Sequence, residues 1–228
     1  MSRPLAILLD LDGTLVDTLE LLLRASRHAF RDRAERVPSE AEWRAGIGTP
    51  LARQLAPYAA DDAELAALVA GYRGYQHEHH DRLTRLYPGV REALATLRGR
   101  GHPLGVVTSK ADVIAHRTLA HVGLAPWMSV VVGTESSARH KPDPEPVRVA
   151  LAALGHAPHE ALFLGDSPHD MQAGRAAGVV TVAAGWGFFN AAALADTAPD
   201  HTLDDVAALP ALVERLARER AAGPAARA

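Results

Sequence analysis

The sequence contains no cysteine among its 228 residues and very little lysine. Without a thiol, disulfides, thiolate metal sites and cysteine nucleophiles are excluded. Among the 24 Lys and Arg residues, only Lys110 and Lys141 are lysine. A compact ammonium and a planar guanidinium are not interchangeable, so each of these lysines is a candidate for a specific role. Any catalytic chemistry has to come from oxygen and nitrogen groups.

Long apolar runs and a broad excess of positive charge are also missing. No run reaches the roughly 18 to 20 apolar residues that would span a bilayer, and the N-terminal run is too short for a signal peptide. The net charge of -3, with both signs interspersed, offers no positive field for nucleic acid. We therefore expect a cytoplasmic protein, a monomer or a homodimer, with neither a membrane nor a nucleic-acid partner.

Short apolar runs alternate with helical patterns over much of the chain. The runs that predict buried strands are 5–9, 104–107, 130–132, 161–164 and 179–183. Helices are expected over 18–30 and 88–98, and from starts near Asp112, Pro144, Ser167 and Val206. Alternation at this spacing predicts βαβ units and an α/β fold with a doubly wound, Rossmann-like parallel sheet.

The segment of about 39–83 interrupts this alternation. It carries helical patterns broken at 46–50 and at Gly71, and it has no strand of convincing β-branched content. An all-helical insert is therefore predicted. The tail 221–228 is rich in small residues, so we expect it to fray.

Polar residues follow the predicted strands, where ligands of an open parallel sheet bind. These residues are Asp10, Asp12, Thr108, Ser109, Lys110, Lys141, Asp166, Ser167 and Asp170. Each of these segments alone also fits a turn or a helix cap. Because each one follows a predicted strand, the set as a whole favours a ligand-binding site. Clustered carboxylates either protonate or collect a cation, and hard oxygen ligands suit Mg²⁺. Magnesium, a hydroxyl and a lysine together favour phosphoryl transfer, with one aspartate as nucleophile and another as acid and base.

This ordered set of residues resembles the haloacid dehalogenase-like (HAD) phosphohydrolase superfamily over about 5–216. Residues 10–18 resemble its nucleophile motif, which implies that Asp10 attacks phosphorus and that Asp12 serves as general acid and then base. Thr108, with Ser109 beside it, resembles the motif whose hydroxyl binds the phosphoryl group. Lys141 resembles the lysine that balances the phosphate charge.

The resemblance also implies a metal site and a domain division. Residues 165–170 resemble the fourth motif, in which Asp166 binds Mg²⁺ with the Asp10 carboxylate and the Asp12 backbone carbonyl. Asp170 would support the metal or its waters. Residues 1–15 and 85–228 would form the HAD core domain, and residues 16–84 would form a helical cap domain that excludes bulk water.

Within the superfamily, the residues favour a phosphatase. An aspartate at position 12 disfavours dehalogenation, and a cap without lysine disfavours Schiff-base cleavage of phosphonates. The segments 47–51 and 87–90 resemble phosphoglycolate phosphatases and their pyrophosphatase-like neighbours. The expected function is Mg²⁺-dependent hydrolysis of a small phosphorylated metabolite through a phosphoaspartate intermediate. Phosphoglycolate is the favoured substrate. The alternatives are a pyrophosphatase and a phosphosugar mutase resembling β-phosphoglucomutase.

Other assignments from the sequence concern the cap and a competing class of protein. Arg44, Thr49 and Arg53 flank the cap's glycine-rich turn and are expected to contact the substrate. In the run 77–80, only His77 and His80 share a helix face, so a solvated face or a hinge is favoured over a metal site. A phosphate-accepting signalling module would be about half this length and would lack the second aspartate. The role of Lys110 stays open.

Overall fold

The computed structural model describes residues 3–222 and contains a parallel sheet of six strands in the order β5-β4-β1-β6-β7-β8. The strands are β1 (Ala6–Leu9), β4 (Leu104–Val107), β5 (Met128–Val132), β6 (Ala161–Gly165), β7 (Val180–Ala184) and β8 (His201–Leu203). Strand β1 pairs with both β4 and β6, so the chain winds outward from β1 in both directions. The predicted doubly wound sheet is confirmed, and its topological switch point lies at β1.

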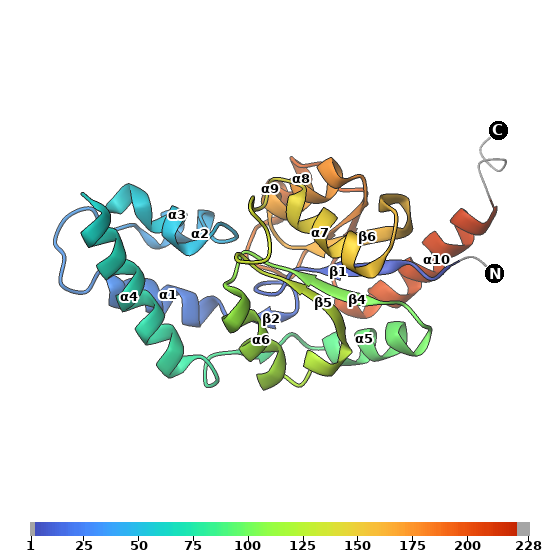
Figure 1. Ribbon diagram of the computed structural model, residues 1–228, viewed down its shortest axis with the longest axis horizontal. Coiled ribbons are helices and arrows are strands. Elements are labelled where there is room, and N and C mark those ends of the chain that lie inside the picture. Colours follow the sequence, from blue (N-terminus) through green and yellow to red (C-terminus); the bar gives the residue numbers. More distant parts are fainter. Residues whose placement is uncertain (1–2, 223–228) are drawn as a thin grey trace.

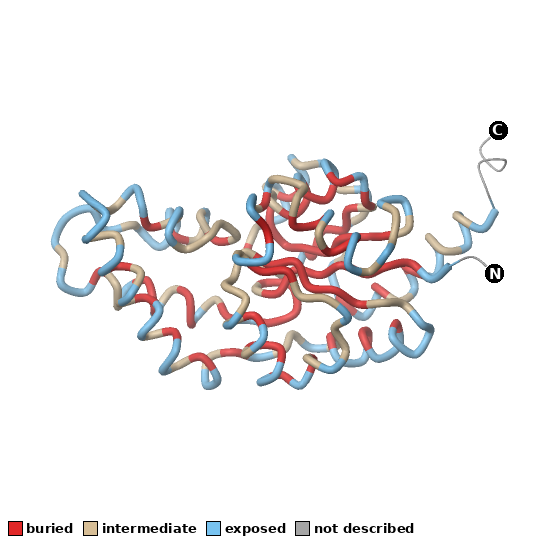
Figure 2. The backbone as a smooth tube through the Cα atoms, viewed as in Figure 1, coloured by how far each residue is buried: buried red, intermediate tan, exposed pale blue. Residues whose placement is uncertain are grey.

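Helices cover both faces of the sheet (Figure 1). One face carries α5 (Val90–Gly99), α6 (Asp112–His121) and α10 (Leu209–Ala222), and the other carries α7 (Glu145–Leu154) and α8 (Pro168–Ala177). Ile7 and Leu9 of β1 face the first set, whereas Leu8 faces the second. The four inner strands β1, β4, β6 and β7 are buried on both faces and are mainly apolar, and Figure 2 shows them among the most buried parts of the chain.

The helical segments of the insert lie together beyond one end of the sheet (Figure 1). They are α1 (Leu19–Ala29), α2 (Glu40–Ala45), α3 (Leu51–Leu55), a 3₁₀ turn at Ala56–Tyr58 and α4 (Asp62–His79). A capping box between Ser39 and Glu42 starts α2, and the Asp61 side chain caps α4. Leu22, Leu68 and other apolar residues of the insert form a hydrophobic cluster, which Phe188 of the segment after β7 joins.

The helix break predicted at Gly71 is wrong. Helix α4 continues through this residue, and a Cβ placed there would lie 3.5 Å from the Cα of Ala29 in α1. This is an ordinary van der Waals distance, so Gly71 is a glycine that the helix tolerates and does not mark a helix end. By contrast, the break predicted over 46–50 is found between α2 and α3.

Two short strands lie at the junction between the insert and the sheet. Strand β2 (Val16–Asp17) pairs antiparallel with β3 (Arg85–Leu86). The division into residues 1–15 and 85–228 on one side and 16–84 on the other stays a prediction. The short elements β2, β3, β8 and α9 (Ala191–Ala195) were not predicted from the sequence, because a few residues show no periodicity.

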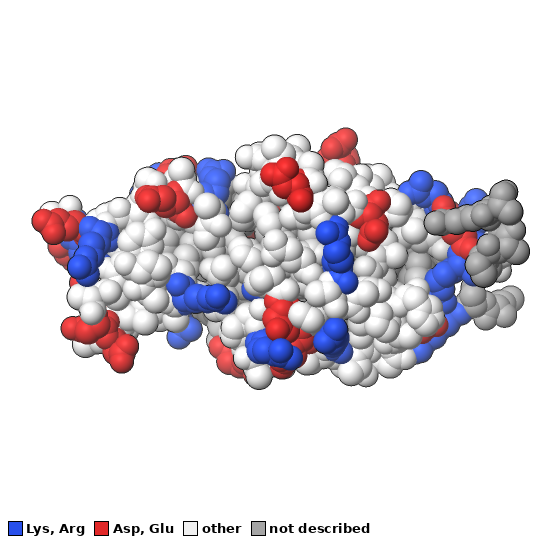
Figure 3. Space-filling model, turned by 90° about the horizontal axis from the view of Figure 1, so that it is seen from above, with Lys and Arg blue, Asp and Glu red and all other residues white. Residues whose placement is uncertain are grey.

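The surface and the chain ends complete the description of the fold. Lys and Arg side chains are interspersed with Asp and Glu on the face seen in Figure 3. No helix within residues 3–222 combines the length and the apolar character that crossing a membrane requires. Helix α10 ends at Ala222, and the rest of the tail that was expected to fray lies outside the described residues.

Candidate active site

The polar residues that follow β1, β4 and β6 meet at the carboxyl edge of the sheet. Leu9 of β1 lies beside Val106 of β4 and Leu164 of β6, so the residues that follow these strands are neighbours. The backbone N–H of Asp10 donates to the Leu164 carbonyl at 2.9 Å. The backbone N–H of Thr108 donates to the Val132 carbonyl at 2.9 Å. The parallel sheet thus gathers the nucleophile and phosphate-binding candidates at its switch point.

Lys141 is buried at the base of this site. Its ammonium donates to Asp10 Oδ1 at 2.8 Å, to Asp170 Oδ1 at 2.6 Å and to the Val107 carbonyl at 3.3 Å. Burial alone would lower the pKa of this lysine, but the Asp10 and Asp170 carboxylates raise it above its usual value. The side chain therefore stays a cation although it is only 1% exposed.

Three buried carboxylates lie close together here, and the Lys141 ammonium contacts two of them, Asp10 and Asp170. Oxygen atoms of Asp10, Asp166 and Asp170 all lie within 4.8 Å of one another. Burial raises the pKa of Asp10 to about 7, with Lys141 opposing the shift, and burial and the neighbouring carboxylates raise the pKa of Asp166 well above its usual value. The cluster therefore has more negative charge than its own cation balances, and its donor set is one that could hold a metal ion.

Local structure fixes the orientation of Asp166 and Asp170. The Asp166 carboxylate accepts the Phe188 backbone N–H at 2.7 Å and the Thr14 hydroxyl at 3.1 Å. Asp170 lies in a capping box at the start of α8, where its Oδ2 accepts the Ser167 backbone N–H at 3.0 Å. Both carboxylates are thus held by hydrogen bonds before any ligand binds.

Gly13 leaves the space that the Asp166 carboxylate occupies. Its φ is +83°, and a Cβ there would lie 2.3 Å from Asp166 Oδ2. We expect Gly13→Ala to lower the free energy of unfolding by about 1–3 kcal/mol, because alanine is strained at positive φ and would displace a fixed carboxylate. Urea unfolding followed by circular dichroism measures this.

Gly74→Ala is the matched control for that substitution. Gly74 lies inside α4, and a Cβ there would meet nothing within 4 Å. This variant should gain about 0.5–1 kcal/mol, because alanine is the better helix former. A Gly13→Ala protein that unfolds at the same urea concentration as the parent protein would show that this turn tolerates a side chain.

Asp12 points away from the acidic cluster. Lys110 donates to its two carboxylate oxygens at 2.6 and 2.7 Å, and the Thr18 hydroxyl donates at 2.6 Å. The metal ligand expected from Asp12 is its backbone carbonyl and not its side chain. The carboxylate is thus free to pair with Lys110 without affecting that expectation. Lys110, whose role the sequence left open, is thus the ion-pair partner of Asp12.

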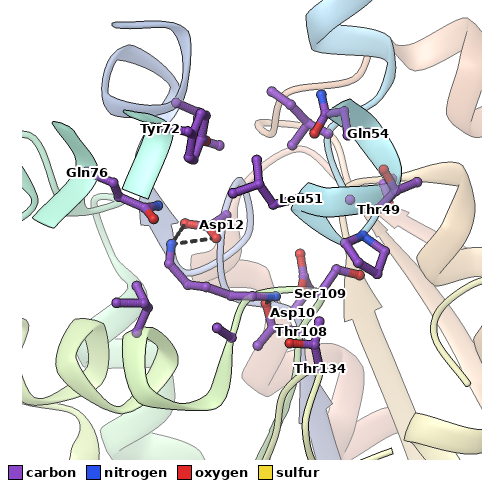
Figure 4. A pocket seen from close by; sticks show the side chains of 18 of the residues that line it. Asp10, Asp12, Thr49, Leu51, Gln54, Tyr72, Gln76, Thr108, Ser109 and Thr134 are labelled. Carbon is purple, nitrogen blue, oxygen red and sulfur yellow. Dashed lines mark hydrogen bonds and ion pairs between the residues drawn. The ribbon is translucent and has the colours of Figure 1, made fainter. Parts of the chain in front are cut away.

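A cavity of about 220 Å³ lies between the sheet edge and the helical insert. Asp10, Asp12, Thr108 and Ser109 line it from the sheet, and Figure 4 shows helices α3 and α4 of the insert opposite them. The Ser109 hydroxyl oxygen is buried and has no hydrogen-bond partner among residues 3–222. A polar ligand in the cavity would satisfy this hydroxyl.

The cap residues chosen from the sequence are only partly at the cavity. Thr49 lines it. Arg44 forms an ion pair with Glu40 at 3.2 Å and Arg53 is exposed, and neither lines the cavity in the described part of the chain. The contacts of these two arginines with a substrate stay a prediction.

Sequence reasoning missed the cap residues that do face the sheet. Tyr72 and Gln76 lie one turn apart on α4 and line the cavity, together with Gln54 of α3 (Figure 4). Burial and the Asp12 carboxylate raise the pKa of Tyr72. The available signal was Gln76, which lies four residues after Tyr72 and so on the same helix face, where an apolar residue would be expected.

His80 contributes to the junction of the insert with the sheet domain. It is fully buried, and its Nε2 lies 2.8 Å from the Thr118 hydroxyl of α6 while its Nδ1 lies 2.7 Å from Asp81 Oδ1. His77 contacts Arg117 of the same helix α6. The histidines therefore lie where the insert returns to the sheet domain, as one of the two readings of this run expected.

Known proteins resemble the chain over nearly its whole length. A family model described as haloacid dehalogenase-like hydrolase matches residues 7–184. The pyrophosphatase PpaX of Bacillus velezensis is 35% identical and that of Bacillus pumilus 36% identical, each over 91% of this chain and 95% of the relative. A crystal structure of a predicted phosphoglycolate phosphatase from Haemophilus somnus superimposes with a TM-score of 0.83 and 28% identity, over 93% of this chain and 99% of that one.

Proposed function

The chain belongs to the haloacid dehalogenase-like hydrolase family, and on that premise we propose that it is a Mg²⁺-dependent phosphatase of small phosphorylated metabolites. One observation carries the proposal: the buried Asp10 carboxylate lies at a cavity with a lysine ammonium 2.8 Å away and a second aspartate, Asp12, beside it. This arrangement provides a nucleophile, a charge for the phosphate and a group for proton transfer.

The reaction proceeds in two steps on the residues of this chain. The Asp10 carboxylate attacks phosphorus, the bond from phosphorus to the leaving oxygen breaks, and Asp12 gives that oxygen a proton. Water then attacks the phosphoaspartate and gives a proton to Asp12, which releases phosphate and restores Asp10. The Thr108 and Ser109 hydroxyls donate to the phosphoryl oxygens, and Lys141 offsets their charge.

The metal site of the proposal consists of the Asp10 and Asp166 carboxylates and the Asp12 backbone carbonyl, with Asp170 behind them. The fit rests on the donor chemistry, because three buried carboxylates cluster with one ammonium between two of them, and two of the three have raised pKa values. When bound, Mg²⁺ would neutralise negative charge on the phosphoryl oxygens that the protein's own donors leave exposed.

Two substrates are supported for this site. We propose phosphoglycolate first, from the cavity's modest volume of about 220 Å³ and the similar structure from Haemophilus somnus. Pyrophosphate is the second candidate, because the Bacillus relatives are named pyrophosphatases. Residues 16–84 act as a cap in this proposal and keep bulk water from the phosphoaspartate.

Phosphate release from a substrate panel tests the proposal. The panel contains phosphoglycolate, pyrophosphate, sugar phosphates and an aryl phosphate, each measured with Mg²⁺ and with EDTA. We expect Mg²⁺-dependent release, at least about 100-fold above that in EDTA, because the unbalanced carboxylates cannot bind a phosphate dianion without the cation. No release from any member would contradict the proposal, and phosphate exchange that requires a sugar bisphosphate would indicate a mutase.

A further inference from the structure

Lys110 is a second buried cation of the site, and the proposed reaction does not use it. Its side chain is 6% exposed, and its ammonium contacts both oxygens of Asp12. Its backbone N–H donates to the Thr108 hydroxyl at 3.2 Å, and its carbonyl accepts the Thr134 N–H at 3.0 Å. Thr108 and Thr134 both line the cavity, so these two hydrogen bonds fix the backbone of Lys110 at the cavity wall. The Lys110 side chain extends into the cavity from there.

The position of Lys110 places it beside the leaving group. In the proposed reaction Asp12 protonates the leaving oxygen, so a cation bound to Asp12 lies on that side of the phosphate. Lys141 is not available there, because Asp10, Asp170 and the Val107 carbonyl already surround its ammonium. Among the described residues the Lys110 ammonium has only the two Asp12 oxygens as acceptors, which leaves it an N–H to donate.

Gln76 faces the same part of the cavity from the cap. It is 8% exposed and lines the cavity. Figure 4 shows this side chain pointing from α4 toward Asp12, the ion-pair partner of Lys110. An amide N–H at the cavity wall can donate to an anionic group of a bound ligand. Arg73 of α4 also lines the cavity and adds positive charge on the cap side.

We propose that Lys110 and Gln76 bind a second anionic group of the substrate, a carboxylate or a second phosphoryl group close to the scissile phosphate. The inference rests on the proposed phosphatase activity and narrows its substrate class. Carboxylate and phosphoryl oxygens accept charge-assisted hydrogen bonds from an ammonium and ordinary ones from an amide. Leu51 and Ile114 line the same cavity, and their apolar surface strengthens this attraction by excluding water. An uncharged leaving group can form only ordinary hydrogen bonds with these donors, without the added attraction of its own charge.

Matched substrate pairs and Lys110→Met test the inference. Phosphoglycolate is compared with 2-hydroxyethyl phosphate, and pyrophosphate with methyl phosphate, by kcat/KM at saturating Mg²⁺. The parent protein should prefer the charged member of at least one pair. Lys110→Met keeps the length of the side chain but removes its charge, so kcat/KM for the charged member should fall about 30-fold or more further than for the neutral member. The pair with the larger loss tells whether the group is a carboxylate or a phosphoryl group.

Gln76→Glu tests the same site with an added negative charge. This variant changes the size of the side chain little, so KM for the charged substrates should rise about tenfold or more while KM for the neutral ones changes less. Arg27→Met is the matched control for Lys110→Met, because it removes a cation whose side chain is 68% exposed on α1. Its substrate preference should equal that of the parent protein.

Two results would overturn the inference. One is an equal loss for charged and neutral substrates in Lys110→Met, which would assign Lys110 to supporting Asp12 alone. The other is a parent protein that does not distinguish the members of either pair. Both differ from failure of the proposed function, in which no substrate, the neutral ones included, releases phosphate with Mg²⁺.

Discussion

Asp10→Asn is expected to lower kcat by at least about 10,000-fold, because an amide oxygen does not act as a nucleophile toward phosphorus. Asparagine has nearly the volume of aspartate, and its carbonyl oxygen can still accept a hydrogen bond from Lys141, whose ammonium lies 2.8 Å from Asp10 Oδ1. The fold should therefore persist. Phosphate release and far-ultraviolet circular dichroism, measured on the same preparation, check both expectations.

The control for this substitution is Asp32→Asn. The Asp32 side chain is 83% exposed and is not among the described residues that line the cavity, so the same chemical change there should leave kcat unaltered. Trapping of the phosphorylated protein with hydroxylamine should label the parent at residue 10 and fail to label Asp10→Asn. Retained turnover in a preparation free of parent protein would remove the nucleophile role from Asp10.

The pH dependence of stability provides a second readout of Asp10. Burial raises the pKa of Asp10 from 3.8 to about 7 in the folded protein, so the folded state binds this proton up to a higher pH than the unfolded state does. The contribution to stability is therefore fully present below about pH 4 and is lost as the pH rises through about 7. In EDTA, the melting temperature of the parent should fall over this range more than that of Asp10→Asn.

The sheet and the location of the site could be predicted from the sequence because of one physical regularity. A strand buried on both faces is a continuous apolar run, and its first polar residue lies at the sheet edge. Asp10, Thr108 and Asp166 each follow such a run, so their meeting follows from parallel pairing alone. Short elements without a period, such as β8 and α9, give no such signal.

The cavity wall on the cap side could not be predicted in the same way. Which residues face the sheet depends on how the helices of the insert pack, and the glycine inside α4, Gly71, looked like a helix break. The pairing of Lys110 with Asp12 joins residues 98 positions apart, and no local pattern encodes it. Arg44 and Arg53 were chosen by their nearness in sequence to a glycine-rich turn, but neither lines the cavity in the described part of the chain.

Lys141→Met is expected to lower both turnover and stability, because it leaves buried carboxylates without their cation. The ammonium is 1% exposed and joins Asp10 to Asp170 at 2.8 and 2.6 Å. Breaking a buried ion pair from one side costs about 3–5 kcal/mol, and losing a transition-state charge partner lowers kcat on the order of 1,000-fold. Urea unfolding measures the first effect and phosphate release the second. An unchanged rate would remove Lys141 from the site.

A second variant separates the two effects of Lys141→Met. In Lys141→Met with Asp170→Asn, one uncompensated carboxylate is removed together with the ammonium, so part of the lost stability should return. Turnover should not return, because the phosphate still lacks the cation that offsets its charge. The Mg²⁺ concentration that gives half-maximal activity separates a role of Lys141 on the phosphate from a role on the metal ligands. Without the ammonium, Asp10 and Asp166 should attract Mg²⁺ at least as strongly as before, so this concentration should not rise. A weakened Mg²⁺ response with normal turnover at saturation would mean that Lys141 organises the metal ligands and does not act on the phosphate.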